Sequence, residues 1–425
     1  MAHDIAFQMA ASNIRYGWGV TREVGLDLQD MGMKRTLLVI DPALIDLPVG
    51  QTVLESLRSG KIDYAVFDEV SIEPTDHSFR RAAEVATDGQ FDSFVAVGGG
   101  STIDTAKAAD LYATHPADFF TYVNAPIGEG LPVPGPLKPL IAIPTTAGTG
   151  SETTGVAIFD QVDRRAKTGI ADRHLKPMLG IVDPENTATM PPAVAAFTGL
   201  DVLSHAVESY TAIPFTSRPL PPRPKNRPAY QGSNPISDVW ALRALELVNQ
   251  YLVRAVQDPS DREARANMLL ASAIAGIGFG NAGVHLPHGM SYPVAGMVRE
   301  FRPSGYDVDH AIVPHGLSVI LNAPAVFVFT APADPQRHLR AAAALGADVN
   351  GVSPADAGQL LAQRIVHFMK TLDVPNGLGA VGYTEDNIPA LVEGTLPQHR
   401  VTKLSPIPVG KPELSELFRN SLTIW

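Results

Sequence analysis

The chain has 425 residues, of which 45% are hydrophobic and 18% are charged. This length predicts more than one domain, and the apolar content suffices for large buried cores, which argues against disorder along the whole chain. The 44 acidic and 33 basic residues leave a net charge of -11, which argues against a general nucleic-acid-binding protein. Cysteine is absent, so disulfides, iron–sulfur clusters and a cysteine nucleophile are excluded, and a transition metal would need carboxylates and some of the 12 histidines.

The first residues lack the basic region and apolar core of a secretory signal, and they lack the Arg- and Ser-rich composition of a transit peptide. Apolar runs such as Phe94–Val97 and Leu140–Ile143 are far shorter than a membrane span. We therefore expect a cytoplasmic protein with no membrane partner, or a protein of the mitochondrial matrix if its source is a eukaryote.

Residues 1–187 are expected to form an α/β domain with a doubly wound, mainly parallel sheet. Short apolar runs bounded by turn residues predict buried strands, and helical patterns such as Ser78–Thr87 lie between them. Alternating strands and helices are typical of a parallel sheet, which binds ligands at the carboxyl ends of its strands. The predicted strands are Thr36–Ile40, Tyr64–Phe67, Phe94–Val97, Leu140–Ile143 and Leu179–Val182.

Residues 188–425 are expected to form an all-α domain. Long helical patterns follow one another there, and none of them shows the alternation of a strand. A Pro- and Arg-rich loop between Ile213 and Pro235 interrupts them, and a loop of this length inside a compact domain is usually functional or disordered. The predicted helices are Pro192–Thr211, Ile236–Gln257, Asp261–Ile277, Pro354–Leu372 and Pro412–Leu422.

Consecutive glycines, Gly98, Gly99 and Gly100, directly follow a predicted strand and precede a helical pattern. We expect Ser101 to cap that helix and Asp104 to lie in its first turn, and we count Gly98 and Asp104 among the candidate cofactor-binding residues. Glycines let the backbone approach a ligand closely, and free N–H groups at a helix start suit a pyrophosphate. The turn matches neither GxGxxG nor a Walker loop, so a plain strand–helix turn stays the alternative.

A second loop, PTTAGTGSE, follows the next strand and supplies small hydroxyl groups from Thr145, Thr146, Thr149 and Ser151. Its composition alone would favour a solvated loop. Two such loops after successive strands favour a nucleotide cofactor lying across the sheet edge. Asp41, which ends an earlier strand, could accept from a ribose hydroxyl, although an Asp in this position is also a common helix cap.

Carboxylates and histidines form a second group of candidate residues. Asp201 and His205 are four residues apart, which places both side chains on one face of a helix, about 5–6 Å apart at the Cβ atoms. One carboxylate with two or three imidazoles can bind a divalent first-row metal that polarises an alcohol oxygen for hydride transfer to a nicotinamide. The alternative is structural histidines and an Asp–His surface contact. Farther on lie His288 and His315, each followed by Gly near a predicted helix start, and His285 and His310, which we expect to lie outside the ligand set.

Five segments of the chain carry a family resemblance. They are GGGSTIDTAK (Gly98–Lys107), PTTAGTGSE (Pro144–Glu152), TGLDVLSHAVESY (Thr198–Tyr210), HGMSYPVAG (His288–Gly296) and PHG (Pro314–Gly316). In this order they resemble the iron-containing group III alcohol dehydrogenases. The resemblance implies an N-terminal nucleotide-binding domain, a C-terminal metal- and substrate-binding helical domain, NAD, and a divalent metal. The family implies Fe(II), and Zn(II) would suit the same ligands.

Residue by residue, the resemblance assigns both the metal and the catalytic centre to Asp201, His205, His288 and His315. It also implies that NAD contacts a set of residues on the strand ends and loops. These residues are Asp41, Gly99, Gly100, Ser101, Thr145, Thr146, Thr149 and Lys167.

The chain departs from the family pattern at two positions. Many members have a second histidine four residues after the third ligand, where this chain has Tyr292. If that histidine relays protons in its relatives, Tyr292 would have to substitute through its phenol. The family often has Asn-Pro-Thr where this chain has Glu73-Pro74-Thr75. A carboxylate there could accept from a nucleotide hydroxyl and would disfavour a 2′-phosphorylated cofactor.

Further segments, among them AYQGSNPISD, GIGFGNAGVHLPHGMSYP and GTLPQHRVTKLSP, resemble one branch of this family, the hydroxyacid-oxoacid transhydrogenases. This resemblance implies hydride transfer through a tightly bound NAD from 4-hydroxybutyrate to 2-oxoglutarate, giving succinate semialdehyde and D-2-hydroxyglutarate. Two alternatives stay open, a conventional NAD-dependent iron-containing alcohol dehydrogenase and a non-catalytic nucleotide-binding scaffold. The expected partners are small hydroxy and oxo acids and further copies of the chain in a homo-oligomer, a dimer or larger.

An acidic protein needs a local cationic patch to bind an acidic substrate. The Pro-rich loop contains no acidic residue and supplies Arg218, Arg223, Lys225 and Arg227. Because the planar guanidinium group binds carboxylates bidentately, Arg218, Arg223 and Arg227 are candidate substrate residues. A solvent-facing loop whose charges serve solubility is the alternative.

Overall fold

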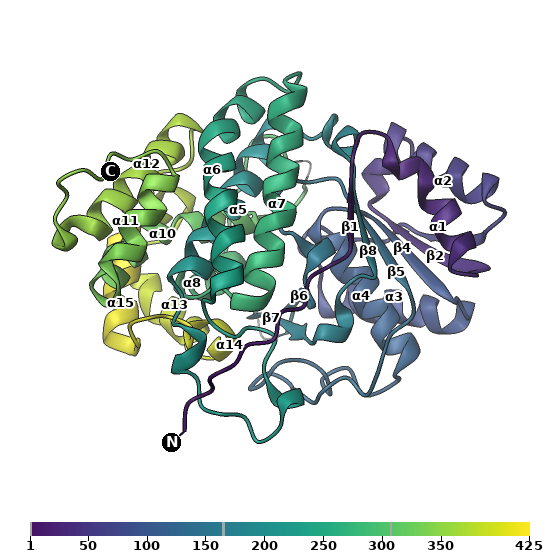
Figure 1. The fold of residues 1–425 in the computed structure, drawn as a ribbon, viewed down its shortest axis with the longest axis horizontal. Coiled ribbons are helices and arrows are strands. Elements are labelled where there is room, and N and C mark those ends of the chain that lie inside the picture. Colours follow the sequence, from purple (N-terminus) through teal and green to yellow (C-terminus); the bar gives the residue numbers. More distant parts are fainter. Residues whose placement is uncertain (1, 164–165, 307) are drawn as a thin grey trace. The chain divides into compact units, whose positions relative to one another are not determined.

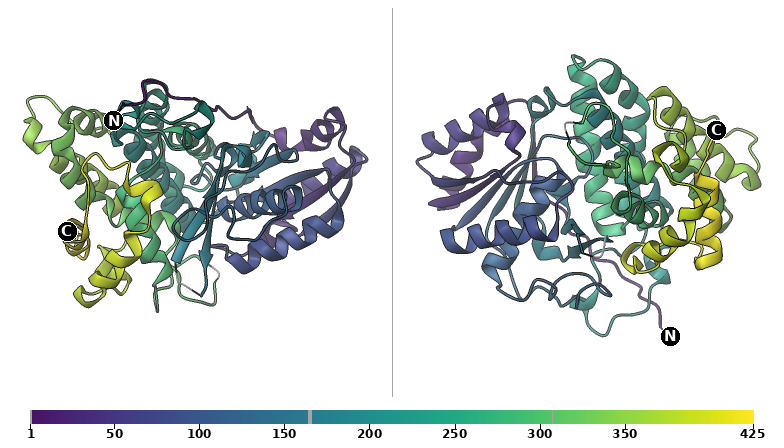
Figure 2. Two further views of the ribbon diagram at one scale, coloured as in Figure 1. Left: turned by 90° about the horizontal axis from the view of Figure 1, so that it is seen from below. Right: turned by 180° about the vertical axis from the view of Figure 1, so that it is seen from behind.

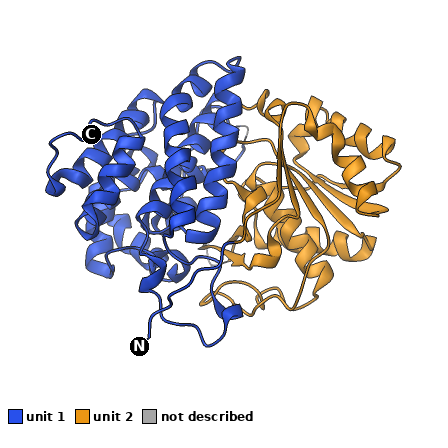
Figure 3. Ribbon diagram, in the orientation of Figure 1, with its two compact units in different colours: residues 1–9, 191–425 blue, residues 10–190 orange. Residues whose placement is uncertain are grey.

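The protein is described from a computed structural model that covers residues 2–163, 166–306 and 308–425 (Figure 1). Contacts divide the chain into two compact units, an α/β unit of Ala10–Met190 and a helical unit of Met1–Met9 with Pro191–Trp425 (Figure 3). Along the chain the division falls between Met190 and Pro191, and residues 1–9 group with the helical unit.

The α/β unit is built on a six-stranded sheet in the order β1-β8-β5-β4-β2-β3, in which neighbouring strands are parallel. The predicted α/β class with a parallel sheet is therefore confirmed. β1 is an additional edge strand, and its three partly exposed residues carry too little apolar pattern to be recognised from sequence. The strands are β1 (Ile14–Tyr16), β2 (Arg35–Ile40), β3 (Asp63–Phe67), β4 (Ser93–Gly98), β5 (Leu140–Pro144) and β8 (Leu179–Val182).

Helices cover both faces of this sheet, as Figure 2 shows. Successive side chains of a strand point to opposite faces. Leu38 of β2 accordingly belongs to the core that includes α1 and α2, whereas its neighbour Leu37 belongs to the core that includes α3 and α4. β2, β4, β5 and β8 are thus buried on both faces, which explains why these strands are continuous apolar runs. The helices are α1 (Val24–Asp30), α2 (Pro48–Ser59), α3 (Asp76–Gly89) and α4 (Gly100–Thr114).

A short antiparallel hairpin, β6 (Val156–Gln161) with β7 (Ala166–Ala171), is not predicted by the sequence pattern. Lys167 lies opposite Asp160 in its register, so charged residues interrupt the apolar alternation by which strands are recognised. Phe159 of β6 packs with Phe79 of α3, which places one side of the hairpin on a core of the α/β unit.

The described residues of the helical unit form helices, turns and isolated bridges but no strand, which confirms the predicted all-α class. The helix α5 (Pro192–Thr211) is buried along nearly its whole length and packs against α6 (Pro235–Gln257) and α7 (Arg262–Ala282). α6 begins where the side chain of Asn234 accepts the backbone N–H groups of Ile236 and Ser237. The shorter helices are α8 (Leu286–Gly296), α9 (His315–Ile320), α10 (Ala323–Thr330), α11 (Pro335–Ala344), α12 (Ala357–Thr371), α13 (Ile388–Thr395), α14 (His399–Thr402) and α15 (Lys411–Ser421).

Among the described residues, no single helix has both the length and the apolar composition needed to cross a membrane. The pair α7 and α8 would meet both conditions together, but the chain bends by 104° between them.

Candidate functional site

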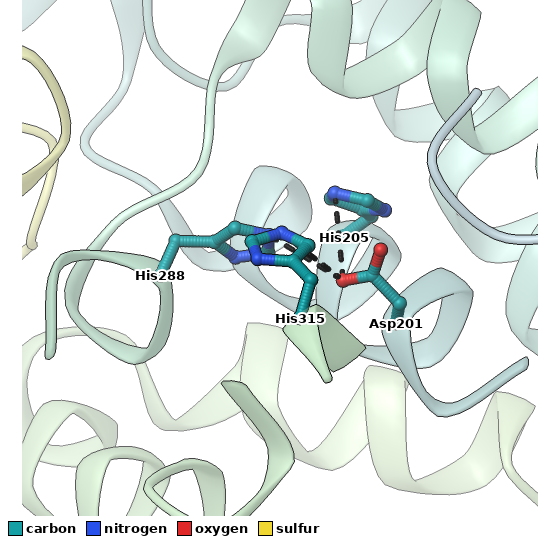
Figure 4. A group of neighbouring side chains, drawn as sticks. All are labelled: Asp201, His205, His288 and His315. Carbon is teal, nitrogen blue, oxygen red and sulfur yellow. Dashed lines mark ion pairs between the residues drawn. The ribbon is translucent and has the colours of Figure 1, made fainter. Parts of the chain in front are cut away.

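Helices α5, α8 and α9 bring four side chains together inside the helical unit. Figure 4 shows Asp201 and His205 from α5, His288 from α8 and His315 at the start of α9. One potential ligand atom from each residue lies within 4.8 Å of the corresponding atoms of the other three. Oδ1 of Asp201 is 3.7 Å, 3.5 Å and 3.9 Å from Nε2 of His205, His288 and His315, respectively.

The local sequence explains how these helices come so close. The four-residue spacing of Asp201 and His205 puts both on one face of α5. Gly316 follows the first residue of α9, and a Cβ atom at this position would lie 2.0 Å from the carbonyl oxygen of Phe197 and 3.0 Å from Cβ of Asp201. Only glycine therefore permits this approach of α9 to α5, and the approach carries His315 to the cluster.

The donor set and its protonation fit a divalent metal. Within the described residues, Oδ1 of Asp201 and Nε2 of His288 are buried and have no hydrogen-bond partner, although such atoms are rarely left unsatisfied. Burial opposes ionisation of Asp201, but His205, His315 and His288 hold the pKa of its carboxyl below the ordinary value. Burial lowers the pKa of His205 to about 3, which keeps this imidazole neutral. A carboxylate with three imidazoles whose Nε2 atoms lie within 4 Å of it is a ligand set for Fe(II) or Zn(II).

Glu208, which the sequence analysis did not identify, holds one of the four residues in place. It lies on α5 seven residues after Asp201, is fully buried, and places Oε1 2.6 Å from Nδ1 of His288. Burial alone would lower the pKa of His288, but Glu208 and Asp201 raise it to about 10. Because Nδ1 faces Glu208, Nε2 stays available to a metal. The spacing of residues 201, 205 and 208 along one helix face is the signal that could have revealed Glu208.

We expect Glu208→Gln to weaken metal binding by about 10- to 100-fold, because carboxylates that orient ligating histidines contribute this much. Equilibrium dialysis against a chelator of known affinity would measure the dissociation constant. His310→Ala is the matched control, since His310 is exposed, lies outside the cluster, and places its Nδ1 3.0 Å from Oδ1 of the adjacent Asp309. An unchanged affinity in folded Glu208→Gln would contradict this orienting role.

Tyr292, which stands where many family members have a second histidine, lies on α8 one turn after His288 and is buried. Its hydroxyl accepts a hydrogen bond of 2.7 Å from Nη2 of Arg400, and a catalytic role for it stays a prediction. His285 and His310 lie outside the cluster, as expected. His285 is buried with Nε2 3.0 Å from Oγ1 of Thr211.

In the α/β unit, the glycine-rich turn and the threonine loop follow the adjacent strands β4 and β5. The N–H of Thr145 donates to the carbonyl oxygen of Gly98. A Cβ atom at Gly99 or Gly100 would lie 3.2 Å from Oγ1 of Thr146 or 2.6 Å from Cγ2 of Thr149, so the two loops touch where these glycines stand. The structure thus brings most of the predicted phosphate-binding residues to one edge of the sheet.

Two details of the helix after the glycines differ from expectation. Gly99, not Ser101, occupies the position before α4, and no side chain caps the helix. Oγ of Ser101 instead accepts from the N–H of Glu73, and Asp104 lies beyond the first turn. The prediction that Ser101 caps this helix is therefore wrong. Uncapped N–H groups at a helix start remain able to bind a phosphate.

Asp104 and Ser151 meet in a buried network around Lys107, a residue that the sequence analysis did not single out. Nζ of Lys107 is fully buried and lies 3.2 Å from Oδ1 of Asp104 and 2.5 Å from Oγ of Ser151. Asp104 also accepts from the N–H of Ile158. These contacts join α4, the threonine loop and β6, which gives Asp104 and Ser151 a structural role. A role of the two residues in cofactor binding stays a prediction.

Two more cofactor candidates, Glu73 and Lys167, form an ion pair, and Lys167 also pairs with Asp160 at 3.2 Å. Burial opposes the charge of Lys167, but Asp160 and Glu73 raise its pKa above the ordinary value. The carboxylate of Asp41 accepts from the N–H of Ala43 and caps the turn Pro42–Leu44. Asp41 therefore acts as a cap, which was the alternative to binding a ribose hydroxyl. That binding stays a prediction.

Two of the three candidate substrate arginines are bound to a carboxylate of the protein itself. Asp4 is buried, and its Oδ2 lies 3.2 Å from Nη2 of Arg218 and 2.8 Å from Nε of Arg227. The hydrogen bond from Arg227 is the main cause that lowers the pKa of Asp4 to about 2. Arg223 is exposed. A substrate role for these three arginines stays a prediction, and Asp4 competes for two of them.

Comparison with known proteins agrees with this geometry. Sequence profiles of iron-containing alcohol dehydrogenase and of the C-terminal part of the same family match residues 11–184 and 229–422. The mitochondrial hydroxyacid-oxoacid transhydrogenase of Bos taurus is 58% identical over 424 residues, which are 99% of this chain and 91% of that protein.

Solved structures show the same fold. A 1,3-propanediol oxidoreductase is 28% identical with a TM-score of 0.85, and the match covers 98% of this chain and all of the other. A sulfoacetaldehyde reductase from Bifidobacterium kashiwanohense, solved in complex with NAD+, is 27% identical with a TM-score of 0.80 over 99% of this chain and 100% of its own. The chain therefore belongs to the iron-containing alcohol dehydrogenase family.

Proposed function

We propose that the protein is a hydroxyacid-oxoacid transhydrogenase. It oxidises 4-hydroxybutyrate to succinate semialdehyde and passes the hydride through a tightly bound NAD to 2-oxoglutarate, which gives D-2-hydroxyglutarate. The observation that carries the proposal is the 58% identity over 424 residues to a transhydrogenase of that name. The cluster of one carboxylate and three imidazoles, all buried except the partly exposed His315, supports it, because the family's chemistry needs such a centre.

In this proposal Asp201, His205, His288 and His315 hold the metal. A bound divalent metal would act as a Lewis acid on the substrate oxygen, and NAD would carry the hydride. Glu208 orients His288, and the burial of α5 around Asp201 and His205 excludes water from one side of the centre.

The glycine-rich turn and the threonine loop are proposed to bind NAD. Backbone N–H groups of Gly99, Gly100 and Ser101 at the start of α4 would bind the pyrophosphate. Glu73, Asp160 and Lys167 together carry one excess negative charge, which supports NAD rather than a 2′-phosphorylated cofactor.

Related proteins are named as mitochondrial in Bos taurus and in Homo sapiens, which supports the mitochondrial matrix as the compartment if the source is a eukaryote. The expected homo-oligomer stays a prediction that sedimentation velocity would test.

The direct test is to incubate the metal-loaded protein, as purified, with 4-hydroxybutyrate and 2-oxoglutarate and no added NAD. We expect D-2-hydroxyglutarate to accumulate in large molar excess over the protein and over its bound NAD. A conventional alcohol dehydrogenase would stop after one equivalent of bound cofactor and resume only with free NAD. A scaffold would form no product under either condition. Either of these results would refute the proposal.

A further inference from the structure

Arg400, a residue without an assigned role, lies in the segment GTLPQHRVTKLSP that resembles the transhydrogenase branch. It belongs to α14, and its guanidinium carbon lies 4.9 Å from the centre of the Tyr230 ring. Nη2 donates to the hydroxyl of Tyr292 at 2.7 Å. Nη1 is shielded from solvent and has no hydrogen-bond partner within the part of the chain that the structure describes.

The metal-binding cluster lies close to this guanidinium group. α14 packs against α8 beside His288, since a Cβ atom at Gly289 would be 2.9 Å from Cγ2 of Thr402 and 3.3 Å from Cγ2 of Val401. Tyr292, which binds Arg400, follows His288 by four residues and so lies on the same face of α8, about one helical turn of 5.4 Å away.

Arg400 has no acidic partner within the described residues. No carboxylate there forms an ion pair with it, and its two aromatic neighbours are uncharged. A shielded cation with an unpaired N–H group is costly, and a planar guanidinium group matches a carboxylate. An anionic ligand would supply both the missing charge and the missing hydrogen bond.

We propose that Arg400 binds the carboxylate that lies three carbon–carbon bonds from the reacting carbon of the substrate. The inference rests on the proposed function, which supplies the two substrates. In 4-hydroxybutyrate the reacting carbon is C4 and the carboxylate is C1, and in 2-oxoglutarate the reacting carbon is C2 and the distal carboxylate is C5. The separation is the same, so a single arginine at a fixed distance from the metal serves both half-reactions.

This proposal explains how one site accepts a hydroxy acid and then an oxo acid without rearrangement. Three carbon–carbon bonds of about 1.5 Å each form a chain whose length is similar to one helical turn. This length matches the separation along α8 of His288 from Tyr292, whose hydroxyl binds Arg400. Neutral alcohols lack the carboxylate and would lose this contact.

The test compares Arg400→Met and Arg400→Lys with the wild type in the holoenzyme. We expect Arg400→Met to lower kcat/KM for 4-hydroxybutyrate by about 10- to 100-fold, mainly through KM, because hydrogen bonds to charged groups contribute this much. The value for 1-butanol should fall far less, so the preference for the acid decreases. Arg400→Lys should recover part of that preference. Calorimetric titration with succinate, which cannot react, should show a similar rise in its dissociation constant.

Three control variants separate this role from others. Arg243→Met removes an exposed arginine that pairs with Glu246 on α6, and it should leave the acid preference unchanged. Tyr292→Phe removes the hydrogen bond to Arg400 but keeps the guanidinium group. If Arg400 had only a structural role, Tyr292→Phe and Arg400→Met would have the same effect. Arg223→Met tests the rival cationic loop.

The proposal is overturned if Arg400→Met keeps the wild-type acid preference and succinate affinity, or if Arg223→Met or Tyr292→Phe reproduces its loss. Failure of the proposed function looks different. The wild type would then fail to transfer hydride between the two acids, while Arg400-dependent succinate binding would still support a carboxylate site.

Discussion

Asp201→Ala is expected to abolish metal binding and to lower hydride transfer by about 1,000-fold or more, because a bound metal contributes several kcal/mol to such a reaction. Oδ1 of Asp201 lies within 4 Å of an Nε2 atom from each of the three histidines, and it provides the only negative charge of the four-residue cluster. Without it, three imidazoles remain as ligands, and none of them carries a negative charge to offset that of a divalent ion. Metal content by plasma emission spectrometry and turnover with saturating substrates would measure both effects.

The comparison requires that Asp201→Ala is folded and is prepared in the same way as the wild type. Thermal unfolding of the metal-free wild type and of metal-free Asp201→Ala would establish that the fold is retained. His310 is exposed and lies outside the cluster, so His310→Ala should keep full metal content and activity. Stoichiometric metal in Asp201→Ala with normal turnover would refute the ligand assignment.

Lys167→Met is expected to destabilise the α/β unit by about 3 kcal/mol, since removing one partner of a buried ion pair leaves the other charge unpaired. Lys167 is 1% exposed, and its ammonium group joins Glu73 to Asp160. The variant would keep both carboxylates and lose the ammonium group that joins them. Urea unfolding followed by circular dichroism would measure the change.

A second substitution tests the cause of this loss. Adding Glu73→Gln to Lys167→Met removes one of the two negative charges that Lys167 joins and should recover part of the stability. Arg243→Met breaks an exposed pair on α6 and should change stability by less than about 0.5 kcal/mol. If Lys167→Met unfolds at the wild-type urea concentration, the three-residue ion cluster contributes nothing to the fold.

Sequence pattern predicts those elements whose burial is symmetrical. β2, β4, β5 and β8 are buried on both faces and therefore appear as uninterrupted apolar runs. β1 at the sheet edge is too short for such a run, and in the hairpin β6–β7 the paired residues Lys167 and Asp160 interrupt the apolar pattern. The strands that the pattern misses are therefore the short strand and the two that carry a charged pair.

The functional residues show a similar division. The spacing of Asp201 and His205 on α5 is visible locally, whereas their proximity to His288 and His315 depends on how α5, α8 and α9 pack, and only the family resemblance suggested it. The burial of charged groups has no sequence signature either. Glu208, Lys107 and Arg400 therefore went unrecognised, although each binds a residue that was a candidate.

The contact at Gly316 makes part of the site depend on a residue that has no functional group. Any side chain there would collide with the backbone of α5 at Phe197, and relief of the collision would move α9 and with it His315. Selection that maintains His315 as a ligand must therefore also maintain a residue without a side chain at position 316. Engineers who vary only residues with reactive groups would pass over this position, yet an alanine there would change the spacing of the ligands while leaving all four in the sequence.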